Sequence, residues 1–396
     1  MALILENARV FRGGVLKKAN VKLSDGMIAA VGENIPVSAD DVRFSCEEQI
    51  LIPGFADVHV HLREPGFSEK ETIAAGTAAA KRAGVSVCCP MPNLDPAPDT
   101  LAHLEAELAL IRRDAQVRVV PVGCLTMGRA GKEPADLEAM APYVCAFSDD
   151  GSGVADTAVM RECMKRIAAF DGLVTAHCEF KGYRGNASEW RMIKRDIKLV
   201  RETGCRYHVC HLSTRESLEL VREAKAEGLP VTCETAPHYL LLCDDARRED
   251  TDGRFIMNPP LRSLEDQRAM VAGLADGSID CIATDHAPHT PADKARGAMG
   301  IVGMETAFPV LFTDLVNRGF VSFARLIDAM SVRPRDIFRL GGGRIEPGQP
   351  AELALLDLNA GYAIDPGEFA SKGRNTPFEG WPVKGRVTKL FGARGE

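Results

Sequence analysis

The sequence predicts an α/β protein: a (β/α)8 barrel of the TIM type that carries a small β-sandwich domain built from both chain ends. Through the middle of the 396-residue chain, short apolar runs alternate with segments of helical period, as parallel strands covered by helices do. Both chain ends instead alternate short strands with turns. We expect residues 1–52 and 344–396 to pair into the sandwich, and residues 53–343 to form the barrel.

Eight apolar runs are the candidate barrel strands, because each ends in a polar residue or a Gly/Pro cluster before a helical segment begins. Eight such units within about 230 residues fit a (β/α)8 barrel. A doubly wound sheet is the rival fold, but no glycine-rich phosphate loop follows the first strand. The eight runs are 51–58, 84–91, 117–123, 143–148, 172–177, 205–211, 229–233 and 279–284.

Helices are expected between these runs, where apolar residues recur at the spacing of one helix face. The segment Ser213-Thr214-Arg215-Glu216 resembles a capping box, in which a hydroxyl caps the first turn and a glutamate three residues later returns the bond. The predicted helices are 68–83, 101–114, 154–170, 188–203, 213–227 and 263–275.

Composition and charge exclude several classes of protein. The net charge of −7 and the lack of a Lys/Arg block argue against a nucleic-acid-binding surface. No run approaches the roughly 18 apolar residues of a membrane span, and the N-terminus has no basic region ahead of a long apolar stretch, so we expect no membrane anchor and no signal peptide. The 12 cysteines fall mostly in apolar runs, which predicts buried free thiols in a reducing, cytoplasmic compartment.

Four of the nine histidines fall at or just past the ends of predicted strands, the face at which barrel enzymes build their active sites. His59 and His61 are two residues apart on one strand, so both imidazoles point to the same side and can clamp a metal ion. His177 and His211 end two further runs. Either of these alone would more often be a structural histidine, but four histidines at one rim predict a metal site.

Three other histidines are expected to lie outside this site. His208 precedes His211 by three residues and points to the opposite face of the strand, so we expect it to be structural. His103 lies in a helical run and is expected at the surface. His238 follows a proline and could line the mouth of the barrel, but we leave it out of the site.

Two acidic residues complete the predicted centre. Asp150 follows the run 143–148, and Asp285 ends the run 279–284. One carboxylate can bridge two divalent ions, and another can take and return a proton beside them. The competing interpretations are a turn residue in Asp-Asp-Gly for Asp150 and an Asx-turn for Asp285.

The block GFADVHVHLREPG, the strand-end histidines and the block ATDHAPH resemble the amidohydrolase superfamily. Within it, the chain is similar to the class I dihydroorotase family. HxH alone is a weak motif, but HxH with arginine two residues on, followed in order by MPN, SDDG, AHCE, HVCHLS, MNPPLR and ATDHAPH, is a specific one. The resemblance runs from the N-terminal ENARV segment to AELALLD near the C-terminus.

The resemblance implies a centre of two divalent metal ions, with Zn²⁺ favoured. The ligands would be His59, His61 and Asp285 for the first ion, His177 and His211 for the second, and Asp150 between the two. Many relatives use a carboxylated lysine as the bridge, but no lysine lies in 143–150. Asp150 is preferred to Asp149 because the family places the ligand directly before the glycine.

The implied reaction is the reversible cyclisation of N-carbamoyl-L-aspartate to L-dihydroorotate in de novo pyrimidine (UMP) biosynthesis, with Asp285 as the proton shuttle. A guanidinium at position 63 would suit the substrate carboxylate, because its parallel donors fit a carboxylate bidentately. The implied substrate contacts are Arg63, Asn93, Asn258, His289, Met299 and Gly300. Met299 stands where the family usually has an aromatic residue, and the segment 179–205 is shorter than in familiar members.

Two alternatives stay open. Another cyclic amidase, such as an allantoinase or dihydropyrimidinase, acts on a ring without a carboxylate and has less need of Arg63. An inactive scaffold for aspartate transcarbamoylase would typically have lost ligands, whereas this chain keeps the whole set. A homodimer and an aspartate transcarbamoylase partner are further expectations from the resemblance.

Overall fold

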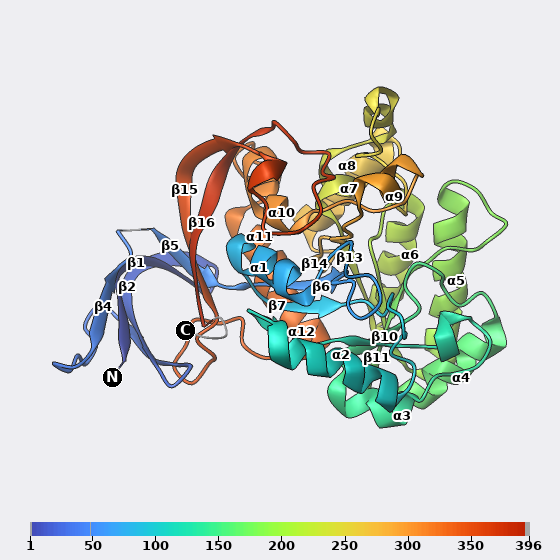
Figure 1. The fold of residues 1–396 in the computed structure, drawn as a ribbon, viewed down its shortest axis with the longest axis horizontal. Helices are drawn as coiled ribbons and strands as arrows, with labels where there is room; N and C mark the ends of the chain where they lie inside the picture. Colours follow the sequence, from blue (N-terminus) through green and yellow to red (C-terminus); the bar gives the residue numbers. More distant parts are fainter. Residues whose placement is uncertain (1, 48, 393–396) are drawn as a thin grey trace.

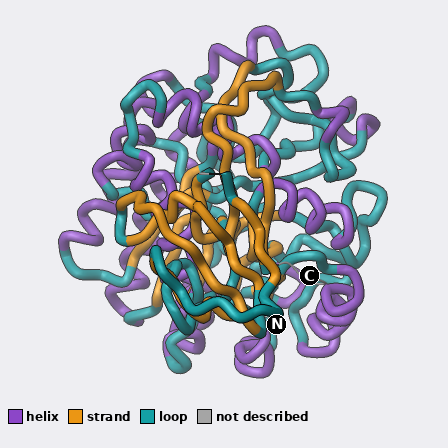
Figure 2. The backbone as a smooth tube through the Cα atoms, turned by 90° about the vertical axis from the view of Figure 1, so that its left-hand side faces the viewer, coloured by secondary structure: helices purple, strands orange, loops and turns teal. Residues whose placement is uncertain are grey.

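The computed structural model describes residues 2–47 and 49–392 and has a mixed α/β architecture (Figure 1). Strands from both chain ends share one sheet, and parallel strands with helices make up the rest of the chain. Figure 2, in which strands are orange, shows the strands in the middle of the view with helices around them. The predicted α/β class is therefore confirmed.

One seven-stranded sheet combines strands from the two chain ends. β1 (Leu3–Arg12) and β2 (Val15–Ser24) form a hairpin whose turn, Gly13-Gly14, has φ values of 58° and 80°, which glycine adopts without steric cost. β5 (Ile50–Pro53) pairs with β1 on one side and with β15 (Leu353–Ala363) on the other, so it joins the two ends. The remaining strands are β3 (Met27–Gly32) beside β2, β4 (Val42–Ser45) beside β1 and β16 (Pro382–Phe391) beside β15.

Two parallel sheets hold the strands of the predicted barrel region. Their strands, in order, are β6 (Phe55–Val60), β7 (Val85–Pro90) and β8 (Arg118–Val119), and then β9 (Val122–Cys124), β10 (Ala146–Ser148), β11 (Leu173–Ala176), β12 (Arg206–Val209), β13 (Val231–Thr235) and β14 (Cys281–Ile282). An isolated parallel bridge joins Val60 to His286. The first strand of one sheet is therefore paired with the segment that follows the last strand of the other.

Two of the predicted apolar runs are divided in the structure. Run 51–58 contains parts of β5 and β6, which belong to different sheets. Gly54 separates them, and it approaches its neighbours so closely that a Cβ atom there would lie 2.3 Å from Oγ of Ser86. Run 117–123 divides into β8 and β9 on either side of Pro121, which has no N–H to donate to a strand ladder.

All six predicted helices are present, with shifted ends in most. They are α1 (Ile73–Ala83), α2 (Leu101–Asp114), α4 (Thr157–Ala168), α5 (Asn186–Thr203), α6 (Arg215–Ala226) and α8 (Leu264–Asp276). Shorter helices, which the sequence did not indicate, are α3 (Leu137–Met140), α7 (Pro237–Leu241), α9 (Pro291–Ala295), α10 (Met304–Leu311), α11 (Phe323–Ile327) and α12 (Arg333–Phe338). α1 begins five residues after the predicted start because Thr72 caps it, accepting a hydrogen bond from the N–H of Ala75 (3.1 Å).

The predicted capping box at α6 is wrong by one residue. Thr214, not Ser213, is the N-cap, and its hydroxyl accepts from the N–H of Ser217 (3.3 Å). Glu216 therefore lies one position too early to return the bond. The hydroxyl of Ser213 instead donates to the buried carboxylate of Glu189 on α5.

The hydrophobic core has separate parts under the two kinds of sheet. One cluster lies within the sheet of the chain ends and includes Leu5, Val21, Leu51 and Leu355. A much larger cluster packs the parallel strands against the helices. All 12 cysteines are free and 10 are buried, as predicted. No described helix is both long enough and apolar enough to span a membrane.

Candidate metal centre and active site

Six predicted ligands come together where parallel strands end. Parallel strands in one sheet present their carboxyl ends at the same edge, so residues far apart in sequence meet there. His59 lies on β6, and the others follow their strands within three residues: His61 after β6, Asp150 after β10, His177 after β11, His211 after β12 and Asp285 after β14. All six are buried.

The carboxylate of Asp150 lies among the four histidines. Its Oδ1 is 3.4 Å from Nε2 of His59, 3.6 Å from Nδ1 of His177 and 3.7 Å from Nε2 of His211, and its Oδ2 is 3.7 Å from Nε2 of His61. The neighbouring carboxylate is turned away, because Asp149 accepts hydrogen bonds from the backbone N–H groups of Leu125 (3.0 Å) and Thr126 (3.1 Å). Asp150 is therefore the aspartate of SDDG that faces the histidines.

Among the described residues, Asp285 lies within 4.0 Å of the ring nitrogens of one histidine pair, His59 and His61. Its Oδ1 lies 3.2 Å from Nε2 of His61 and 3.5 Å from Nε2 of His59. The backbone also turns sharply at the site: Arg63, His211 and Asp285 all have left-handed φ values, of 63°, 36° and 49°. Such conformations cost free energy in residues with a side chain, and they concentrate at functional sites.

The donor atoms fit two metal ions that share one bridge. Four groups of side chains have ligand atoms within 4.8 Å of one another, and two of them share Asp150: His59, His61 and Asp150, and Asp150, His177 and His211. Nε2 of His59 and Oδ1 of Asp150 are buried and make no hydrogen bond with the described residues. Buried polar atoms are rarely left without a partner, so converging atoms of this kind suit divalent cations that bind imidazole and carboxylate.

Two carboxylates that the sequence analysis did not single out hold the histidine rings from behind. Glu234, on β13, lies with Oε1 2.8 Å from Nδ1 of His59. Glu179 lies with Oε2 3.2 Å from Nε2 of His177. The opposite nitrogen of each ring, Nε2 of His59 and Nδ1 of His177, faces Asp150. Carboxylates in this position fix the tautomer and orientation of histidines that bind metals.

The pKa shifts reflect a carboxylate surrounded by imidazoles. Burial opposes ionisation of Asp150, but the charge of His59 and the nearby imidazoles of His177 and His211 outweigh it and hold the pKa well below its usual range. Burial likewise opposes charge on His177, yet Asp150 and Glu179 raise its pKa to about 9. The pKa of Asp285 is also lowered, since His61 and His59 outweigh its burial. A charged Asp285 can accept a proton.

Arg63 and His289 lie together beside this centre. The buried guanidinium donates through Nε to the carbonyl of Pro288 (3.2 Å), and its Nη2 lies 3.3 Å from Nε2 of His289. That same His289 nitrogen lies 2.8 Å from the carbonyl oxygen of Met299. Burial lowers the pKa of His289 to about 4, with the charge of Arg63 acting in the same direction, so its ring is neutral at pH 7.

The other predicted substrate contacts lie in the same region. Asn93 donates to the backbone carbonyl of Asp150 (3.1 Å), and Asn258 donates to Glu179 (3.0 Å). Gly300 has a φ of 135°, and a Cβ there would lie 2.9 Å from the carbonyl oxygen of Ala287, so glycine is required. The side chain of Met299 is 56% exposed. The carbonyl oxygen of Met299 is the atom that contacts His289.

Three of the remaining histidines have other environments. His208 lies 2.7 Å from Oγ1 of Thr232 and 3.2 Å from Oε2 of Glu234, so it is buried and bonded on both sides. His103 is 46% exposed and bonds to Asp99. His238 is buried with Nε2 unbonded to the described residues, and its pKa falls to about 4, mainly through burial and against the charge of Asp285.

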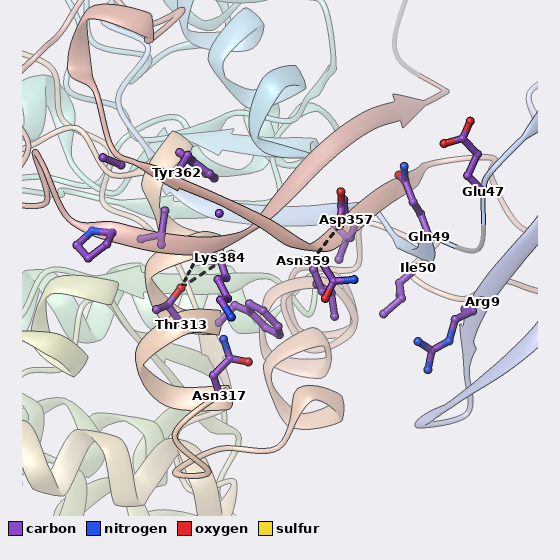
Figure 3. Close-up of a pocket in the computed structure, with 17 residues that line it drawn as sticks. Arg9, Glu47, Gln49, Ile50, Thr313, Asn317, Asp357, Asn359, Tyr362 and Lys384 are labelled. Carbon is purple, nitrogen blue, oxygen red and sulfur yellow. Dashed lines mark hydrogen bonds between the residues drawn. The ribbon is translucent and has the colours of Figure 1, made fainter.

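A groove of about 1130 Å³ lies away from the histidines (Figure 3). It is bordered by β15, β16 and the helical turn 312–316, where Thr313 accepts from the N–H of Lys384 (2.8 Å). Arg9, Gln49 and Tyr362 also line it. None of the six predicted ligands borders the groove, so its size does not make it the reactive site.

Comparison with known proteins supports the family suggested by the motifs. Residues 48–189 match the model of the family described as dihydro-orotase-like. The chain is 44% identical to the dihydroorotase of Anoxybacillus flavithermus, over 98% of this chain and 96% of that one, and 44% identical to the dihydroorotase of Bacillus caldolyticus, over 99% and 97%.

Solved structures show the same fold. The L-hydantoinase (dihydropyrimidinase) of Arthrobacter aurescens superimposes with a TM-score of 0.92 at 25% identity, covering 100% of this chain and 95% of that one. The D-hydantoinase (dihydropyrimidinase) of a Thermus species superimposes with a TM-score of 0.88 at 23% identity, covering 98% and 93%. Because the sequence identity to the dihydroorotases is much higher and extends over nearly the whole of both chains, the protein belongs to the dihydroorotase family.

Proposed function

We propose that the protein is a dihydroorotase that interconverts N-carbamoyl-L-aspartate and L-dihydroorotate. The observation that carries the proposal is the buried guanidinium of Arg63 beside a centre of four histidines and two aspartates. A ring substrate with a carboxylate needs a fixed cation next to the reactive group, and Arg63 supplies one. Uncharged rings of the dihydropyrimidine type do not need it.

The fold proposed for this function is a closed barrel. β8 and β9 lie on either side of one proline and count as one interrupted strand, which leaves eight parallel strands between β6 and β14. The bridge between Val60 and His286 supports closure. We propose domain limits of 1–52 and 344–396 for a small β-sandwich, and 53–343 for the (β/α)8 barrel; the separate core of the end strands supports this division.

The proposed centre holds two divalent ions, with Zn²⁺ favoured by the resemblance. His59, His61 and Asp285 would hold the first, His177 and His211 the second, and Asp150 both. When bound, such ions lower the pKa of water and polarise the carbonyl that it attacks. The place of Asp285 beside His61 supports its role as the group that moves the proton.

The chain's own residues then account for the rest of the reaction. In the hydrolytic direction, Asp285 takes the proton of the attacking water, the ring C–N bond breaks, and Asp285 delivers the proton to the leaving nitrogen. In the synthetic direction the same aspartate works in reverse. Arg63 and His289 would hold the carboxylate of the substrate, while Asn93, Asn258 and the Met299-Gly300 backbone would contact the ring.

The test is an ultraviolet absorbance assay for loss of L-dihydroorotate, on protein of known metal content, with dihydrouracil and allantoin in parallel. We expect metal-dependent loss of dihydroorotate alone. The structural likeness to an L-hydantoinase, with a TM-score of 0.92, keeps another cyclic amidase as the alternative, and hydrolysis of an uncharged ring instead would support it. Inactivity on all three rings in metal-loaded protein would favour the scaffold alternative.

A cytoplasmic location, a homodimer and docking to aspartate transcarbamoylase are proposals that rest on the resemblance and the sequence. Light scattering of the protein, alone and mixed with an aspartate transcarbamoylase, tests the last two. A monomer that stays monomeric in the mixture would reject both.

A further inference from the structure

Lys294 is a buried lysine close to the proposed substrate loops but outside the metal centre. It lies on α9, whose first turn is fixed by a reciprocal capping box between Thr290 and Asp293. The residue is only 5% exposed. Lysine is almost never buried to this extent unless its charge has partners.

The partners of this ammonium are backbone carbonyls. Nζ donates to the oxygens of Ile256 (3.0 Å), Ala298 (2.8 Å) and Gly300 (2.9 Å). An ammonium has three N–H donors, so all of them are used. No carboxylate oxygen of the described residues lies within 4.0 Å of Nζ. Burial lowers the pKa of Lys294 to about 8, against the charges of Asp250 and Asp252, which raise it.

These three carbonyls belong to two segments that are far apart in sequence. Ile256 lies two residues before Asn258, and Ala298 and Gly300 flank Met299. The N–H of Gly300 also donates to Ile256 (3.0 Å), and Asn375 donates to the carbonyl of Gly300 (2.9 Å). A single charge thus ties together the backbones that present two groups of proposed substrate contacts.

The same contacts extend toward Arg63. The carbonyl of Met299, between two residues held by Lys294, lies 2.8 Å from Nε2 of His289. That nitrogen is 3.3 Å from Nη2 of Arg63. It can donate to Met299 or accept from Arg63, but not both at once. The position of the 298–300 backbone therefore influences which partner His289 takes.

We propose that Lys294 is a positioning residue that sets the distance between the Asn258 segment and the Met299-Gly300 segment, and through it the affinity for the ring substrate. This role rests on the proposed function. Lys294 touches neither the metal ligands nor the reacting atoms, so it should affect substrate binding and not the chemical step.

The test compares Lys294→Met, which keeps the length of the side chain without its donors, with Lys294→Gln, which keeps two donors. The exposed Lys198 on α5 supplies a matched control, Lys198→Met. We expect KM for dihydroorotate to rise about tenfold in Lys294→Met, with kcat changed less than about threefold. Lys294→Gln should lie between Lys294→Met and the wild type, and metal content should stay equal in all proteins.

Hydrogen exchange of the metal-loaded protein without substrate separates this proposal from the proposed function. Exchange across 256–258 and 298–300 should accelerate in Lys294→Met and not in Lys198→Met. Unchanged exchange, or a loss of kcat without a rise in KM, would overturn the positioning role. So would loss of the folded state in both Lys294 variants, which would assign the lysine to the fold. If the wild type ignores dihydroorotate while the exchange result holds, only the substrate assignment fails.

Discussion

The histidine pair on and just after β6 and the pair that follows β11 and β12 face Asp150 from different surroundings. Behind His59 lies Glu234, whose side chain is 1% exposed and whose second oxygen is held by His208. Behind His177 lies Glu179, which is 39% exposed. We call Glu234 the inner carboxylate and Glu179 the outer carboxylate.

The outer carboxylate contacts both a predicted metal ligand and a proposed substrate contact, whereas the inner carboxylate contacts two histidines. Oε2 of Glu179 accepts a hydrogen bond from Asn258 (3.0 Å), a proposed substrate contact, as well as lying beside His177. The partners of Glu234 are histidines of the strand framework. The first half of the centre, His59 and His61, is therefore held by buried strands. The second half, His177 and His211, is coupled through Glu179 to the segment that carries Asn258. The following predictions test that difference.

The carboxylate common to both halves should give the largest effect. Asp150→Asn removes a charge that faces all four histidines, so we expect loss of bound metal from both halves and a fall in kcat/KM on the order of 10⁴-fold. Metal analysis and steady-state kinetics measure the two results. Asp40→Asn, at an exposed position, is the control. Two metal ions per chain in Asp150→Asn would reject the shared bridge.

Asp285 faces only the first half, so its replacement should separate turnover from the fold. Asp285→Asn should reduce kcat by about 10³-fold, because the proton no longer has an acceptor beside His61. Thermal unfolding should stay close to that of the wild type, and metal in the second half should be retained. Unchanged turnover would reject the proton-shuttle role.

Replacement of the inner carboxylate should have the next largest effect. Glu234→Gln leaves His59 without the charged partner that fixes its tautomer, and such changes typically weaken metal binding by about 10- to 100-fold. Titration of metal-free protein with Zn²⁺ in the presence of a competing chelator should show one weakened site and one unchanged site. Equal weakening of both sites would mean that the two halves are not independent.

Features of the fold and of the site could be predicted from the sequence where they depend on residues that are close together in the chain. The alternation of apolar runs and helical segments gives the α/β class, and it also locates the carboxyl ends of the strands, where His59, His61, His177 and His211 meet. α2 begins and ends at the predicted residues because its limits are set by local signals, including the hydroxyl of Thr100, which accepts from the N–H of His103 (3.2 Å). The roles given to the ligands stay predictions.

What the sequence could not indicate depends on distant partners. The inner carboxylate lies 175 residues from His59 in sequence, and Lys294 lies 38 residues from Ile256. A glutamate near the end of an apolar strand was the available signal for the first, and nothing local marks the second. The division of run 51–58 has the same cause, since β5 pairs with β15 some 300 residues further along the chain.

The pH dependence of metal binding should test the role of His177 as a ligand in the second half of the centre. The pKa of His177 in the metal-free protein is raised to about 9 from its ordinary 6.5, so its ion pairs contribute stability below pH 6.5 that is lost as the pH rises through 9. A metal ion must displace this proton. We expect affinity for Zn²⁺ to rise about tenfold per pH unit between pH 7 and 9, with proton release measured by calorimetry in two buffers. An affinity for Zn²⁺ that does not change between pH 7 and 9 would contradict this prediction.

The outer carboxylate should give the smallest effect on metal and a visible one on substrate. In Glu179→Gln the charge is lost from a group that solvent already screens, so Zn²⁺ affinity should fall by less than about fivefold. The glutamine still reaches Asn258, but as a weaker acceptor, and KM should rise by about two- to fivefold. Kinetics and chelator competition on the same protein give both numbers. A loss of metal affinity as large as that of Glu234→Gln would remove the distinction between the inner and outer carboxylates, because exposure would then have no bearing on how firmly each histidine ring is held.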